Sequence, residues 1–279
     1  RGEKMEWIEI FKAIILGIVQ GITEWLPVSS TGHMILVDEF LQLSMSDSFK
    51  EIFFVVVQFG SILAVVLLYW KKIFPFNFNK KPFVEKDIII MWTKIALACV
   101  PAAIIGLKWD DQLNALFYNV QTVSIMLILF GVLFIIVENH NKGKIPKVTN
   151  MNQVTYKMAL IIGIFQVIAA VFPGTSRSGA TIVGALLIGI SREIATEFTF
   201  FLAIPVMFGA SLLKIAKLGL ALKSFELLVL GVGTVVSFIV SVFVIKFLMS
   251  YIKKHDFKVF GWYRIILGII LLVYFFFIR

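Results

Sequence analysis

Two apolar segments of this chain are versions of one sequence, and both break at a proline. Residues 17–30 are Gly-Ile-Val-Gln-Gly-Ile-Thr-Glu-Trp-Leu-Pro-Val-Ser-Ser, and residues 163–176 are Gly-Ile-Phe-Gln-Val-Ile-Ala-Ala-Val-Phe-Pro-Gly-Thr-Ser. Proline interrupts a helix, and each segment continues into a loop rich in hydroxyl groups. Matching breaks in two parts of an apolar chain predict an internal repeat, with a binding site where the repeats meet near the bilayer midplane.

The composition of the chain is that of a membrane protein. Hydrophobic residues make up 59% of it and charged residues 15%, and its mean hydropathy is +0.95. Soluble domains are about half apolar and about a quarter charged. The net charge of +9 is assigned to loop lysines at a membrane surface, because no basic amphipathic helix indicates a nucleic-acid partner. A polytopic protein of the lipid bilayer is therefore predicted.

Six apolar runs are long enough to cross a bilayer, because a spanning helix needs about 20 apolar residues. They cover residues 52–70, 88–107, 120–138, 194–213, 226–248 and 260–278. Four shorter pieces form two pairs, each split by one hydroxyl-rich loop: 8–24 with 33–43, and 155–171 with 178–190. Each pair is predicted to be a re-entrant hairpin of two half-helices. Such irregular backbone survives at membrane depth only when it is buried in protein or lines a wet cavity.

The predicted fold is all-α and has two repeats, residues 5–138 and 150–279, each a re-entrant hairpin followed by three spans. The hairpins cover about residues 8–43 and 155–190. Because three is odd, the second repeat must enter the membrane upside down relative to the first, which gives inverted topology. The Phe-Gly pairs at 59–60 and 208–209 continue the similarity beyond the hairpins.

Lysine counting gives the predicted orientation. The 71–86 loop, the 139–157 linker and the 251–259 turn hold five, four and three lysines, and all three fall on one side of the six-span arrangement. Short lysine-rich loops face the cytoplasm. Both chain ends then face outward, the two hairpins enter from opposite sides, and their polar loops meet in the middle.

Gln20 and Glu24 lie on one helix face, which Gly17 and Gly21 share. Small residues on that face would let another helix approach closely. A carboxylate inside a membrane helix costs about 2.5–3.5 kcal/mol on insertion scales. Glu24 is therefore expected to face a cavity or a partner; the alternative is a solvated position at the helix end.

The first loop ends in three hydroxyls, Ser29, Ser30 and Thr31, with His33 just behind them. Backbone N–H groups at the start of a helix form a ready anion site. Helix capping is the alternative role of such hydroxyls. Capping accounts for one of the three, and a lone histidine is more often structural than catalytic.

Arg177 is the only arginine among residues 2–191, and it lies in the loop of the second hairpin. The hydroxyls around it belong to Ser176, Ser178 and Thr181. A guanidinium can hold phosphate oxygens with two parallel hydrogen bonds. The structural alternative is an ion pair between Arg177 and Glu24 that ties the repeats together, and the two roles are compatible.

Several classes of enzyme are excluded by missing motifs. The chain has no Gly-x4-Gly-Lys-Ser/Thr loop, which argues against an ATP-driven pump or a kinase. It has no Cys-x5-Arg loop, and no cluster of cysteine and histidine suggests zinc. No His–Asp pair follows the Ser-Arg-Ser segment, so the pattern of haloperoxidase-like lipid phosphatases is missing.

These motifs resemble those of the bacterial undecaprenyl-diphosphatase family, also called the bacitracin-resistance family. The resemblance rests on residues 20–33, Gln-Gly-Ile-Thr-Glu-Trp-Leu-Pro-Val-Ser-Ser-Thr-Gly-His, and on residues 173–181, Pro-Gly-Thr-Ser-Arg-Ser-Gly-Ala-Thr. Residues 191–198 and 202–207 add to it, so that it covers essentially the whole chain. The first family motif has Glu or Gln, three intervening residues and then Glu. Gln20 is therefore the amide variant, which puts a paired carboxylate at this position in doubt.

The resemblance implies removal of the terminal phosphate from undecaprenyl diphosphate, a polyprenyl diphosphate lipid. This regenerates the lipid carrier for cell-wall synthesis and confers bacitracin resistance. It also implies a divalent cation, Mg or Ca, and a place in the bacterial plasma membrane. The site is predicted to face outward. The matching functional positions are Glu24, Ser30, His33, Ser176, Arg177, Ser178 and Thr181, with Gln20 weaker.

Two chemical routes fit these residues. In the first, Ser30 is the nucleophile, His33 is its base, and Glu24 orients His33 or binds the metal together with Gln20. In the second, a water held by the metal attacks, with Glu24 as ligand or base. In both, Arg177 acts on the phosphoryl group, and Ser29, Thr31, Ser176, Ser178 and Thr181 bind phosphate.

Transport is the competing class of function, because inverted repeats with broken helices are also a transporter architecture. The protein would then flip undecaprenyl phosphate, alone or beside hydrolysis, through the same midplane site. Glu24 would couple protons, and Arg177 would bind the lipid phosphate. A homodimer is compatible with the sequence, which carries no signal for one.

Overall fold

The regular structure of the described residues is entirely helical. The computed structural model describes residues 2–77, 82–218 and 222–278. In chain order the helices are α1 (Gly2–Thr23), α2 (Ser30–Phe40), α3 (Asp47–Ile73), α4 (Lys86–Phe117), α5 (Val120–Asn141), the short η1 (Met151–Gln153), α6 (Tyr156–Val171), α7 (Arg177–Leu187), α8 (Arg192–Leu218), α9 (Ser224–Ile252), α10 (Lys258–Val273) and the terminal turn η2 (Tyr274–Ile278).

The six predicted spans are confirmed. Helices α3, α4, α5, α8 and α9, and α10 with its terminal turn, are long and apolar enough to cross a membrane. The hairpin helix α1 differs from its prediction, because it has 22 residues and begins at Gly2 instead of residue 8. All of its charged residues precede Ala13, so only its second half suits the membrane interior.

The two predicted broken segments each form a pair of helices, α1 with α2 and α6 with α7. Helices α2 and α7 each have 11 residues, and α6 has 16. All three are shorter than a spanning helix. Helix α1 ends at Thr23, shortly before Pro27, and α6 ends at Val171, shortly before Pro173. The predicted alternation of broken and continuous apolar segments therefore holds along the described residues.

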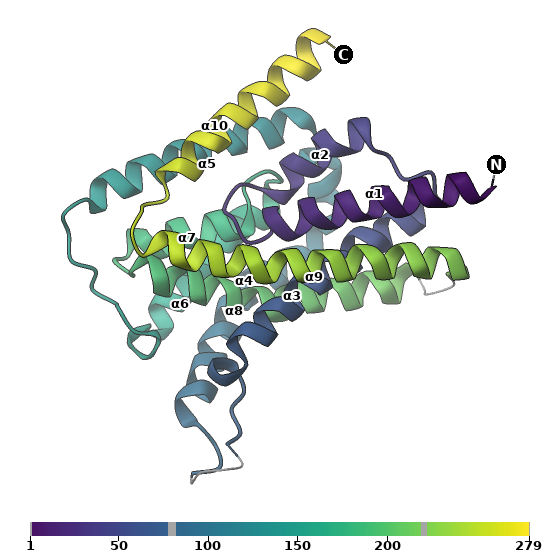
Figure 1. Ribbon diagram of the computed structural model, residues 1–279. Helices are drawn as coiled ribbons and strands as arrows, with labels where there is room; N and C mark the ends of the chain where they lie inside the picture. The colour runs from purple at the N-terminus through teal and green to yellow at the C-terminus, as the bar shows by residue number, and fades with distance from the viewer. Residues whose placement is uncertain (1, 78–81, 219–221, 279) are drawn as a thin grey trace.

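Helices of the two halves pack against each other reciprocally. Helix α1 packs on α9, and its counterpart α6 packs on α4, which corresponds to α9 in the first half. Helices α5 and α10 lie side by side, as Figure 1 shows, and α3 contacts α8. A two-fold relation between the halves would produce this exchange. The repeat boundaries at 5–138 and 150–279, and the inversion of one repeat, stay predictions.

The predicted close approach at Gly17 and Gly21 is confirmed. A Cβ atom on Gly17 would lie 2.7 Å from the carbonyl oxygen of Gly233, and one on Gly21 would lie 2.8 Å from that of Ser237. Both oxygens belong to α9. The helix face that carries Gln20 therefore packs directly on the α9 backbone, as small residues permit.

The Phe-Gly pairs offer a matched test of this packing. An alanine Cβ at Gly60 would collide with the carbonyl oxygen of Thr234 on α9, whereas one at Gly209 would meet no atom within 4 Å. We expect Gly60→Ala to cost about 1–3 kcal/mol through overpacking, and Gly209→Ala to leave stability unchanged or slightly higher. Thermal unfolding of the two purified variants checks this. Equal melting temperatures would contradict the close approach of α3 to α9.

The two chain ends lie opposite two of the three lysine-bearing connections. The linker between α5 and α6 and the turn between α9 and α10 lie toward one end in Figure 1, and the start of α1 and the end of α10 lie toward the other. Lys80 and Lys81 of the 71–86 loop lie outside the described residues. The assignment of the lysine-bearing end to the cytoplasm stays a prediction.

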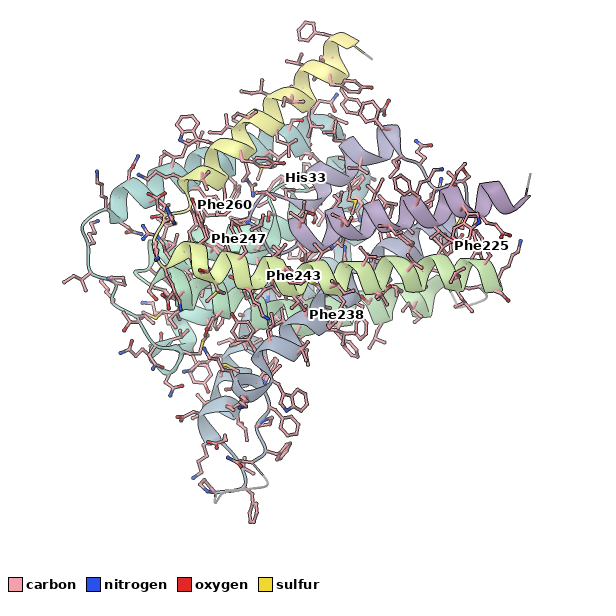
Figure 2. The ribbon with its side chains drawn as sticks, viewed as in Figure 1. His33, Phe225, Phe238, Phe243, Phe247 and Phe260 are labelled. Atoms are coloured by element: carbon pink, nitrogen blue, oxygen red, sulfur yellow. The ribbon has the colours of Figure 1, made fainter. Side chains whose placement is uncertain are left out.

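The outer surface of α9 is apolar along its length. Val235, Ile239, Phe243 and Phe247 recur every four residues, and each is about half exposed or more. Figure 2 shows Phe243 and Phe247 along this helix. A stripe of this kind suits contact with lipid tails, as expected for a spanning helix.

Candidate active site

The two polar loops end in the same local structure. Ser29 caps α2 and Ser176 caps α7, each accepting a hydrogen bond from the glycine N–H three residues on, at 3.4 and 3.2 Å. Both serines have positive φ, 73° and 69°. Such backbone costs about 1–3 kcal/mol at a residue other than glycine and clusters at active sites and ligand clamps.

These caps correct the alignment of the loops by one position. The sequence match pairs Ser30 with Ser176, but the structure gives Ser29 and Ser176 the same role. The second loop has one more residue between its proline and its cap. Consequently, Ser30 and Arg177 hold equivalent places as the first residues of α2 and α7, and Thr31 follows in the first turn of α2.

An ion pair between Arg177 and Glu24 joins the two loops. The Arg177 Nη2 atom lies 2.8 Å from Glu24 Oε1, and the two side chains are only 15% and 9% exposed. Gln20 Nε2 donates to the other Glu24 oxygen at 2.9 Å. The Ser178 hydroxyl faces the Glu24 carbonyl oxygen at 3.5 Å. The structure thus brings together the strongest predicted residues of both loops.

Helix α8 contacts Arg177 and Thr181 through Thr199. The Thr181 hydroxyl donates to the carbonyl oxygen of Arg177 at 2.9 Å and shares a 2.9 Å hydrogen bond with the Thr199 hydroxyl. Arg177 Nη1 donates to the Thr199 carbonyl oxygen at 3.3 Å. Ser176 and Ser178 share a hydrogen bond of 3.1 Å between their hydroxyls. Thr181 therefore braces the loop, while Ser176 and Ser178 are the residues on either side of Arg177 in the chain.

His33 is bonded differently from the predicted serine–histidine pair. Its Nδ1 lies 2.7 Å from the Ser29 carbonyl oxygen, and its Nε2 lies 2.6 Å from the Tyr263 hydroxyl. A carbonyl only accepts, so Nδ1 carries the proton, and in the neutral ring Nε2 accepts from Tyr263. Both ring nitrogens are engaged away from Ser30. A role for His33 as the base of Ser30 requires the Tyr263 contact to be exchanged.

Three residues of the site were absent from the sequence prediction: Thr199, Tyr263 and Arg264. Arg264 is fully buried in α10 and donates to carbonyl oxygens of both loops. One signal was available for it, because a charged residue within an apolar span marks a functional site by default. Tyr263 and Thr199 gave no such signal, since a tyrosine or threonine in a span is ordinary.

The donor groups of the loops suit one kind of metal site. In the part of the chain that the structure describes, no three His, Cys, Asp or Glu side chains are grouped to hold an ion. The two loops offer the Glu24 carboxylate, with the Gln20 amide beside it. Mg²⁺ is commonly held by one or two carboxylates together with substrate phosphates and water. The residues present fit an Mg²⁺ that binds with a phosphate substrate and do not fit a preformed protein cage.

Comparison with known proteins identifies the family. The family described as bacitracin resistance protein BacA matches residues 13–270. An undecaprenyl-diphosphatase of Desulfitobacterium hafniense is 67% identical over 271 residues, which cover 97% of this chain and 98% of that protein. Undecaprenyl-diphosphatase 1 of Clostridium acetobutylicum is 64% identical over 97% of this chain and 99% of its own length. An undecaprenyl-diphosphatase of Enterococcus faecalis is 60% identical over 96% and 98%. With its six membrane-spanning helices, the chain is therefore a multi-pass membrane protein that belongs to the bacitracin resistance protein family.

Proposed function

We propose that the protein is an undecaprenyl-diphosphatase, which hydrolyses undecaprenyl diphosphate to undecaprenyl phosphate and inorganic phosphate. The observation that carries the proposal is the buried Glu24–Arg177 pair at the junction of two capped loops. It places an anion-binding group and a carboxylate together inside a membrane protein. The relatives named above carry the same activity in their names, and none carries the name of a transporter.

The division between apolar and polar surface supports one position for the substrate. The prenyl tail lies among the spanning helices, and the diphosphate reaches the two loops. The site opens to the outside of the bacterial plasma membrane, opposite the lysine-bearing end. Hydrolysis there would recycle the lipid carrier for cell-wall synthesis. A homodimer, which the sequence left open, is not needed, because one chain supplies every site residue.

The loops stabilise charge on the transferring phosphoryl group. Arg177 holds non-bridging oxygens, Ser176 and Ser178 donate hydroxyl hydrogen bonds, and the N–H groups at the start of α2 and α7 add their dipoles. Loss of one preorganised donor costs about 10²–10³-fold in kcat. Glu24 holds the guanidinium in place until substrate arrives, and the incoming phosphate exchanges with it.

Glu24 and Gln20 would hold a divalent cation, for which Mg²⁺ is the better candidate. One carboxylate with substrate phosphates suits Mg²⁺, whereas Ca²⁺ takes 6–8 oxygen ligands. When bound, the ion supplies neutralisation of charge on the diphosphate. Glu24 would supply its carboxylate, which now contacts Arg177 and Gln20, to such an ion.

The proposed nucleophile is Ser30. It is the first residue of α2 and therefore corresponds to Arg177, the first residue of α7. Its oxygen attacks the terminal phosphorus, the bridging P–O bond breaks, and undecaprenyl phosphate leaves. His33 takes the serine proton after releasing Tyr263, and water then cleaves the phosphoserine. In the rival route, water attacks directly with Glu24 as base.

Replacing Ser30 with alanine separates the two routes. If Ser30 is the nucleophile, Ser30→Ala should lower kcat by at least about 10³-fold, and rapid quenching of the wild type should trap phosphate on this residue. Ser46→Ala, which removes the hydroxyl that caps α3, is the control. Near-full turnover by Ser30→Ala would establish the water route instead.

Phosphate release tests the proposed function itself. Detergent-purified protein with Mg²⁺ should release one phosphate per undecaprenyl diphosphate and leave the monophosphate. Chelation of Mg²⁺ should stop the release. Absence of phosphate from well-folded protein, together with movement of labelled undecaprenyl phosphate across liposomes, would contradict a phosphatase.

A further inference from the structure

Arg264 is a charged residue in an unusual place. It lies within the span of α10 and is completely buried. Figure 1 shows α10 beside α5 and close to α2. A guanidinium inside a membrane protein is costly unless it is fully hydrogen-bonded, and such residues mark functional sites.

The hydrogen bonds of Arg264 join both polar loops. Its Nη1 donates to the Pro27 carbonyl oxygen of the first loop at 3.1 Å. Its Nη2 donates to the carbonyl oxygens of Gly174 and Thr175 in the second loop, at 3.0 and 2.7 Å. Longer contacts of 3.4 Å reach the α5 backbone. One rigid planar group therefore contacts the broken backbone of both hairpins.

The surroundings hold the Arg264 guanidinium in a fixed position. Among the described residues it forms no ion pair with a carboxylate, because every hydrogen bond goes to a carbonyl oxygen. Gly179 makes room for it, since a Cβ there would lie 2.8 Å from Nη1. This explains the glycine after Ser178 in the second motif. An uncompensated cation beside the loops also suits a substrate with several negative charges.

Arg264 also determines which way the loop peptides face. A trans peptide directs its N–H opposite its carbonyl. Because the Thr175 carbonyl points at Arg264, the N–H of Ser176 points to the opposite side. The bond to Pro27 fixes the first loop two residues before its own cap, Ser29. The two serine caps are thereby held at fixed positions relative to each other, and so are Ser30 and Arg177, which follow them.

We propose that Arg264 is a positioning residue of the active site, which holds the two phosphate-binding loops together so that Ser30 and Arg177 act on one phosphate. The proposal deepens the proposed function and rests on it for its kinetic consequences. The geometric part, the joint ordering of both loops, stands without it. Arg264 acts through the loops and touches no reacting atom.

The test compares Arg264→Lys and Arg264→Gln with the wild type. Lysine keeps the charge but cannot bridge both loops with a planar fork, and glutamine removes the charge. Displacement of a reacting group by about 1 Å costs about 10²-fold, so Arg264→Lys should lower kcat by about 10–100-fold with little change in KM. Arg192→Lys is the matched control, because Arg192 is paired with Glu138 away from the loops.

Hydrogen exchange of the loop amides supplies a readout that does not depend on activity. In Arg264→Lys, amides of residues 24–31 and 172–179 should exchange faster together, while Arg192→Lys should leave both loops unchanged. Wild-type kcat in Arg264→Lys would overturn the proposal, since charge alone would then suffice. Faster amide exchange in only one of the two loops would also overturn the proposal. A lower melting temperature with unchanged kcat per folded molecule would do the same. If the wild type itself releases no phosphate, the proposed function fails, and the exchange experiment still decides whether Arg264 couples the loops.

Discussion

Arg177→Ala is expected to lower kcat for phosphate release by about 10³-fold, within the range measured for arginines that stabilise phosphoryl transfer. Among the described residues, its guanidinium is the one cationic group joined directly to Glu24, and it leads the capped helix α7. Its removal takes away the proposed charge-assisted donor to the transferring phosphoryl group. The measurement is the steady-state rate of phosphate release by purified protein with undecaprenyl diphosphate and Mg²⁺.

Two further variants separate this chemical effect from misfolding. Arg177→Lys keeps the charge but loses the two-pronged grip, so its rate should fall between those of wild type and Arg177→Ala. Arg192→Ala removes an arginine from the pair with Glu138. It should lower the melting temperature while kcat per folded molecule stays close to wild type. A comparable loss of kcat in Arg192→Ala would show that the Arg177 effect is one of stability.

Glu24→Gln is expected to lower kcat by about 10²-fold or more, a loss in the range found for catalytic acid–base groups. The amide keeps the size of the side chain but removes the charge that holds Arg177, and with it the proposed carboxylate ligand of Mg²⁺. Raising the Mg²⁺ concentration should recover part of the rate if the carboxylate binds the ion. Phosphate release measured across a series of Mg²⁺ concentrations checks this.

Glu9→Gln is the matched control for this change. Glu9 lies in α1, the helix that ends just before Glu24. It is also buried and is paired with Lys12 at 2.7 Å, but it faces the segment after α2 and not the loops. The same loss of charge there should leave both kcat and its dependence on Mg²⁺ unchanged. Equal losses in Glu9→Gln and Glu24→Gln would contradict a specific role for Glu24.

The order of spans and broken helices along the chain could be predicted from the sequence because membranes restrict the options. A span needs a long apolar run, and a broken helix needs a proline and protein around it. Those requirements predicted the six spans and the two interrupted pairs. The glycines on the Gln20 face likewise predicted a close helix neighbour, because only a small residue permits such contact.

The finer geometry of the site could not be predicted from the sequence. The caps at Ser29 and Ser176 depend on a one-residue difference in loop length, which a match of proline to proline hides. The hydrogen bond between His33 and Tyr263 joins residues 230 positions apart. Arg264 was hidden by the apolar run around it, although its charge was the one available signal.

The central claim, that one site is assembled from both loops, is tested most directly by combining Glu24→Gln with Arg177→Ala. Residues that act as a unit give strongly non-additive losses. We predict that kcat of the double variant equals that of Arg177→Ala within experimental error, because the first substitution already disables the shared site. If the two losses multiply instead, to about 10⁵-fold, the loops act independently and the claim is contradicted.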